Sequence, residues 1–69
     1  MLGLTIEVEL EADGRWLAEV PELSGVLCYG PTRSEAITRA QSLALRVIAD
    51  RLDQGEPVPE LAHVFAVPA

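Results

Sequence analysis

The sequence predicts an α+β domain in which a three-stranded antiparallel meander packs on one long helix, followed by a short final strand. Two patterns carry this prediction. Apolar and polar residues alternate strictly over residues 4–11, which is the period of a half-buried strand. Between residues 33 and 54 the chain contains neither proline nor glycine and its apolar residues recur with helical spacing. With 69 residues, of which 49% are apolar, the chain is expected to form a single domain over residues 1–69.

The first strand and a second one at residues 15–20 are predicted to form a hairpin. Its register follows from the requirement that apolar residues of both strands lie on one face and polar residues on the other. A two-residue loop at Asp13 and Gly14 would set Val8 against Glu19 and mix the apolar and polar faces. A three-residue loop ending at Gly14 keeps each face uniform, and its last position favours glycine because the backbone there is left-handed. This register aligns Leu10 with Trp16, Val8 with Ala18, Ile6 with Val20 and Glu11 with Arg15, and it sets Glu7 opposite Glu19.

The third strand is predicted at residues 26–29, between the turn residues 21–25 and Gly30-Pro31. A capping box then starts the helix at about Arg33: the Thr32 hydroxyl accepts from the Glu35 backbone N–H, and the Glu35 carboxylate reaches back to the Thr32 N–H.

Gly55 is expected to end the helix as the residue after its C-cap. About 20 helical residues span about 30 Å, so this helix is expected to outrun the short strands. Its predicted apolar stripe consists of Ile37, Ala40, Ala44, Val47, Ile48 and Arg51, with Leu45 and Leu52 to its side. We expect a second subunit to cover part of it, giving a homodimer or higher oligomer. Residues 62–67 are predicted to form the final strand.

Charge and cysteine content exclude several functions. The net charge is −6, from 11 acidic and 5 basic residues, and most of it lies in residues 1–30. Such a chain repels phosphates, so direct nucleic-acid binding is not expected. Cys28 is the single cysteine and cannot form an intrachain disulfide, which favours the cytoplasm. Neither a leader sequence nor a membrane-spanning run of about 18 apolar residues is expected.

The order and spacing of several short motifs resemble those of the HicB-like antitoxin family over residues 4–67. These motifs are Asp13-Gly14 before Trp16, Val20-Pro21-Glu22-Leu23-Ser24-Gly25-Val26, Gly30 with Thr32, Glu35-Ala36 with Ala40, and Gly55-Glu56-Pro57-Val58-Pro59. The sequence departs from the family pattern at Ser24, where proline is common, and at Pro31, where an acidic residue is common.

This resemblance implies a truncated ribonuclease-H-like fold and a function as an antitoxin that neutralises a small, basic, RNA-cleaving HicA-like toxin. Many members of the family add a C-terminal DNA-binding segment. Residues 1–69 are expected to lack one, so a role in repressing transcription is not implied.

The candidate partner-binding residues are carboxylates on the polar side of the first hairpin: Glu7, Glu9, Glu11 and Glu19. One interpretation is an acidic strip that attracts a basic toxin. The alternative is a solvated sheet face that discourages edge pairing. Two further functions stay open, an oligomeric scaffold with another partner and a metal-dependent nuclease. The nuclease needs carboxylates converging from several elements, whereas these belong to one hairpin, so no enzymatic activity, catalytic residue, metal or cofactor is expected.

Other chemically suggestive residues are expected to be structural. Cys28 and His63 supply two ligands, short of the three or four typical of zinc sites. Trp16 and Tyr29 are both candidate interface anchors, but Trp16 is expected to pack between sheet and helix. The helix arginines alternate with carboxylates, which indicates a salt-bridged solvent face; they are Arg33, Arg39, Arg46 and Arg51.

Overall fold

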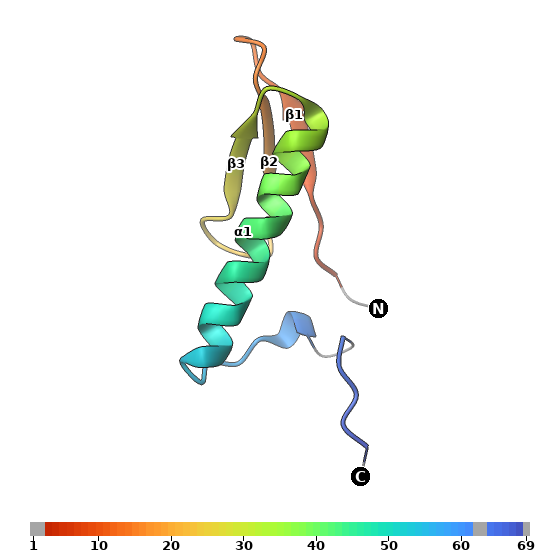
Figure 1. Cartoon of the computed structure of the whole chain (residues 1–69), viewed down its shortest axis with the longest axis vertical. Coiled ribbons are helices and arrows are strands. Elements are labelled where there is room, and N and C mark those ends of the chain that lie inside the picture. The colour runs from red at the N-terminus through yellow and green to blue at the C-terminus, as the bar shows by residue number, and fades with distance from the viewer. Residues whose placement is uncertain (1–2, 62–63, 69) are drawn as a thin grey trace.

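The computed structural model describes residues 3–61 and 64–68 as a three-stranded sheet with one long helix on one of its faces (Figure 1). The strands follow one another across the sheet in the order β1-β2-β3, and both pairs are antiparallel. The predicted α+β meander on a long helix is thereby confirmed. The elements are β1 (Glu7–Leu10), β2 (Trp16–Glu19), β3 (Leu27–Gly30), α1 (Arg33–Asp53) and a short 3₁₀ helix, η1 (Pro59–Leu61).

The hairpin has the predicted register, with Leu10 opposite Trp16 and Glu7 opposite Glu19. Its loop is also as predicted. The Gly14 N–H donates to the Glu11 carbonyl at 3.0 Å, and the Glu11 N–H donates to the Arg15 carbonyl at 2.8 Å. Gly14 has φ +89°, a left-handed conformation that glycine adopts without a Cβ clash. The alternation of apolar and polar residues along the two strands, together with one glycine, is therefore enough to predict this turn.

β1 starts at Glu7, three residues later than the alternating pattern predicts. In this register Thr5 would pair with Pro21, which has no N–H to donate to the sheet. Thr5 bonds to the Glu22 side chain instead. The Glu22 carboxylate accepts from the Thr5 N–H at 3.0 Å and from the Thr5 hydroxyl at 2.7 Å. The ladder consequently ends at Glu7, and residues 4–6 are attached to the turn after β2.

Both ends of α1 are capped. The Thr32 hydroxyl accepts from the Glu35 N–H at 3.1 Å, which confirms one half of the capping box. The Glu35 carboxylate lies 4.0 Å from the Arg39 guanidinium, and the structure records no bond from the Thr32 N–H to it within the described ranges. At the C-terminus Gly55 has φ +75° and donates to the Leu52 carbonyl at 3.1 Å, while Glu56 donates to Arg51 at 2.9 Å; this is a Schellman motif.

The buried face of α1 is a ridge of residues at i, i+4 spacing. It differs from the predicted stripe at the first position, where Ala36 is buried and Ile37 is only half-buried. Small residues let the helix approach the sheet closely. At this short distance the space between helix and sheet holds the alanine side chain of Ala36 and not the larger one of Ile37. The ridge consists of Ala36, Ala40, Ala44 and Ile48.

The interior divides into two clusters. The narrow core, at the start of the helix, consists of Ala18, Ala36 and Ala40, with Ile6, Trp16 and Cys28 packed against it; this confirms the predicted place of Trp16. The broad core, further along the helix, consists of Val20, Leu23, Val26, Ala44 and Ile48.

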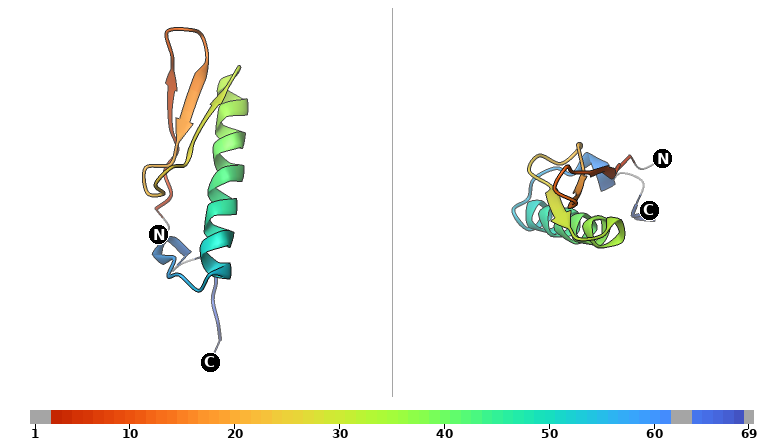
Figure 2. Two further views of the ribbon diagram at one scale, coloured as in Figure 1. Left: turned by 90° about the vertical axis from the view of Figure 1, so that its left-hand side faces the viewer. Right: turned by 90° about the horizontal axis from the view of Figure 1, so that it is seen from above.

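The helix is longer than the sheet, as predicted, and Figure 2 shows it extending beyond the strands. Its 21 residues span about 30 Å, against about 13 Å for strands of four residues. The chain itself covers part of the overhang, because Leu23 and Val26 of the turn after β2 are buried there and Val58 and Leu61 pack beside them. A second subunit is therefore not needed for that part of the helix.

The predicted final strand is not formed in the described residues. Residues 62 and 63 lie outside them, and residues 64–68 adopt no strand conformation. The physical reason is the length of α1: it carries the chain past the sheet, and η1 then packs on the broad core instead of returning the backbone to a strand edge. A strand needs a neighbouring edge to bond to, and here the segment does not lie on one.

Candidate protein interface

One face of the sheet is not covered by any other element of the described chain. α1 lies against the face that carries Trp16 and Ala18, and the alternate residues of each strand point the other way. We call this other side the open face. Its residues form two rows across the strands, Glu7-Glu19-Leu27 and Glu9-Leu17-Tyr29.

The open face brings together three of the four predicted carboxylates, and none of the three forms an ion pair within the described residues. Glu7 and Glu19 are direct cross-strand partners, and Glu9 is the next residue along β1 on the same side. Like charges in such positions repel, by about 0.2–1 kcal/mol per pair. The two ion pairs found among the described residues, Arg15–Asp13 and Arg39–Glu35, involve none of these three. A cationic group brought to this face would relieve the repulsion.

Glu11, the fourth predicted carboxylate, lies at the hairpin end and forms no ion pair within the described residues. Arg15, to whose carbonyl the Glu11 N–H donates, gives its Nε–H to Asp13 at 2.7 Å and places its guanidinium 4.2 Å from the centre of the Tyr29 ring. The pKa of Asp13 is lowered, first by the Arg15 backbone N–H and then by the Arg15 side chain. Of the four predicted carboxylates, Glu7, Glu9 and Glu19 belong to the strands of the hairpin, and Glu11 lies just beyond β1.

Apolar side chains lie beside these carboxylates on the open face. Leu27 is exposed, and Leu17 and Tyr29 are half-buried. Protein interfaces are typically built from such a combination, in which apolar and aromatic groups supply contact area and surrounding charges supply complementarity. Of the two aromatic residues named as candidates from the sequence, Tyr29 is on this face and Trp16 is on the covered one.

The other sequence candidates do not form a site in the described structure. Cys28 is half-buried and packs against the narrow core; its proposed partner His63 lies outside the described residues. Arg39 donates to the Tyr29 carbonyl at 2.7 Å and lies 4.0 Å from Glu35. It is the one helix arginine with an ion pair among the described residues, so the predicted salt-bridged face is formed only at this position. Within residues 3–61 and 64–68 there is no cluster of three or more metal-ligating side chains.

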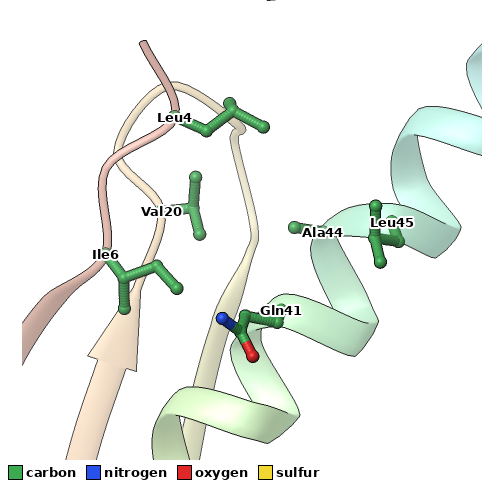
Figure 3. Close-up of a pocket in the computed structure, with 6 residues that line it drawn as sticks. All are labelled: Leu4, Ile6, Val20, Gln41, Ala44 and Leu45. Atoms are coloured by element: carbon green, nitrogen blue, oxygen red, sulfur yellow. The ribbon is translucent and has the colours of Figure 1, made fainter. Parts of the chain in front are cut away.

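Sequence reasoning missed an apolar groove between the helix and two segments of the chain, residues 4–6 before β1 and Val20 after β2 (Figure 3). It has a volume of about 380 Å³ and is lined by Leu4, Ile6, Val20, Gln41, Ala44 and Leu45. The groove exists because α1 packs chiefly against β3 and β2 and least against β1. Leu45, beside the predicted helix stripe, was the one sequence signal for it.

Comparisons with protein-family models, curated proteins and solved structures find no match for this chain. As to membranes, no helix in the described part of the chain combines the length and the apolar character needed to cross a bilayer.

Proposed function

We propose that this chain is an antitoxin that binds a small, basic, RNA-cleaving toxin and that the open face is the contact surface. The observation that carries the proposal is the composition of this face: three carboxylates, none of them in an ion pair within the described residues, lie beside Leu17, Leu27 and Tyr29. The resemblance of the sequence to HicB-like antitoxins supports the same partner class.

The proposed mechanism is occlusion. Carboxylates at Glu7, Glu9 and Glu19 attract the basic RNA-binding surface of the toxin over a distance comparable to the Debye length, about 8–10 Å in physiological salt. Contact then buries the apolar side chains and brings toxin cations to the carboxylates. The toxin surface that would hold RNA phosphates is covered, and cleavage stops without any chemistry by this chain.

The proposal is tested with the double variant Glu7→Lys/Glu9→Lys and with the short basic protein encoded beside this gene as the binding partner. We expect the association rate constant at low salt to fall at least tenfold, since steering of this kind changes on-rates by about 10–10³-fold. Co-expression of the variant should also fail to rescue growth from the toxin. The measurements are stopped-flow binding and a growth assay.

The matched control is Asp53→Lys/Glu56→Lys, which makes the same change in net charge at exposed positions around the end of α1. We expect this control to keep its association rate within about twofold of the unaltered chain after correction for salt. Equal losses in both variants would mean that net charge alone matters. An unchanged rate for Glu7→Lys/Glu9→Lys, or the lack of a basic partner, would instead favour the oligomeric scaffold.

A further inference from the structure

The groove lies beside the start of β1, where residues 4–6 and Val20 face α1. Its lining is aliphatic on the strand side, with Leu4, Ile6 and Val20 facing one stretch of α1 (Figure 3). Leu45, which lines the groove, is 66% exposed on the helix, and Leu10, at the other end of β1, is 55% exposed. The inner surface of β1 thus continues the groove along the strand.

The backbone of β1 is open on the same side. Among the strands of the described residues β1 pairs with β2 alone, so it is an edge strand. The Glu11 N–H donates to Arg15 of the hairpin, and bonding alternates along an antiparallel pair. The N–H and C=O groups of Val8 and Leu10 therefore point to the free edge, where a further strand could bond to them.

The chain contains one segment that matches this edge and has no place in its own sheet. Residues 64–67 read Val-Phe-Ala-Val, and two residues of one parity, Phe65 and Val67, are 71% and 93% exposed. The segment carries no charge, so the acidic hairpin does not repel it. In a strand, Phe65 and Val67 would point to the same side, and the groove has room for an aromatic and an aliphatic side chain.

The direction of the C-terminal segment favours a second molecule over the chain's own edge. Residues 64–68 start level with the C-terminal end of α1 and run beyond it, away from the sheet (Figures 1 and 2). The chain is accordingly extended, with a radius of gyration of 13.9 Å and extents of 51 × 24 × 15 Å, whereas a compact domain of this size has a radius of about 11 Å.

We propose that two copies of this chain form a symmetric dimer by exchanging their C-terminal segments. Residues 64–67 of each copy add to the free edge of β1 of the other, and Phe65 enters the groove between Ile6 and Leu45. The exchange is self-complementary, as a two-fold interface requires. It uses the edge and the covered side of the sheet, so it is independent of toxin binding by the open face.

We call the contact between an exchanged segment and the free edge of β1 the junction. The test uses two full-length variants, one that damages the edge and one that damages the segment. Val8→Pro removes an N–H that points to the free edge and leaves the bonds to β2 in place; Val8→Ala, which keeps the N–H, is its control. Phe65→Glu/Val67→Glu places charge in the exchanged segment. Its control is Leu27→Glu, which adds charge on the open face. Sedimentation equilibrium measures the mass of each variant and of mixtures.

We expect the unaltered chain and both controls to be dimers, and each junction variant to dissociate at least tenfold more readily. An equimolar mixture of the two variants should dimerise more tightly than either variant alone, because one of its two junctions joins an intact edge to an intact segment. A chain that is monomeric at every concentration, variants that stay dimeric, or a mixture that dimerises no better than either variant alone would each overturn the proposal.

A second measurement needs no variant. In the dimer the Val8 and Leu10 amides bond to the exchanged segment, so their hydrogen exchange should slow at least tenfold as the concentration of the unaltered chain is raised. Exchange at these two amides that does not depend on concentration would overturn the proposal even if the variants failed to fold.

Discussion

The narrow core and the broad core are built from the same helix ridge but pack in opposite ways. In the narrow core the helix backbone lies so close to β3 that a Cβ on Gly30 would be 2.6 Å from the Ala36 nitrogen. In the broad core, leucine and valine side chains fill the interior and still leave the groove beside Ala44. The size of the facing side chains therefore sets how closely the layers approach, and a space can remain where larger ones meet.

The largest effect expected from this difference is at Gly30. A Cβ there meets backbone atoms of α1, which cannot move without displacing the helix, so Gly30→Ala should lower the free energy of unfolding by about 3 kcal/mol. Denaturant titration measures this value. Gly14→Ala is the comparison: its Cβ would meet open space at a left-handed φ, and the expected cost is about 1 kcal/mol. Equal costs at the two glycines would contradict the close approach.

A matched pair of helix substitutions compares how much room the two cores leave for a larger side chain. Ala40→Leu adds three carbons to the narrow core, where nothing can make room, and should cost about 2 kcal/mol of unfolding free energy. Ala44→Leu directs the same atoms toward the groove and should change it by no more than about 0.5 kcal/mol. Titrations at several protein concentrations separate this effect from dimerisation. Equal losses would mean that the groove is not available to a side chain.

The smallest effect concerns the tie between Thr5 and the turn that covers the broad core. Hydrogen bonds from the Thr5 N–H, and then from its hydroxyl, lower the pKa of Glu22 below its usual 4.5. A lowered pKa in the folded state stabilises the fold above the unfolded-state value, and this contribution is lost as the pH falls through the folded one.

The unaltered chain should therefore lose more stability between about pH 5 and pH 3 than Glu22→Gln does. Thermal unfolding monitored by circular dichroism across this range measures the difference. Glu56→Gln, which also removes one exposed negative charge, is the control. If the two variants and the unaltered chain lost stability in parallel, the bonds from Thr5 would not contribute to folding.

Interactions between residues close in the chain account for what the sequence predicts correctly. The hairpin register depends on the parity of the side chains and on one loop glycine, and the helix ends depend on Thr32 and Gly55. Each of these is settled within a few residues. The acidic side of the hairpin follows from the same parity, so alternation along the two strands is sufficient to place Glu7, Glu9 and Glu19 on one face.

Interactions between segments far apart in the chain account for the points at which the structure differs from the sequence prediction. Alternation alone extends the first strand to residue 4, whereas Pro21 and Glu22 end it at Glu7. Helical periodicity alone does not choose between Ala36 and Ile37, because that choice depends on how near the sheet lies. The groove cannot be predicted from periodicity for the same reason, since it arises from the position of α1 over β3 and β2.

The sequence by itself determined the three-stranded meander, the long helix, the pairing of the hairpin and the acidic side of the open face, because these follow from periodicity and from local capping and turn chemistry. The tertiary structure alone decided which helix residues are buried, which strand edge is left open and where the final apolar segment lies. Those outcomes depend on the distance between two packed layers and on the reach of a helix longer than its sheet, and neither quantity is encoded in any short stretch of residues.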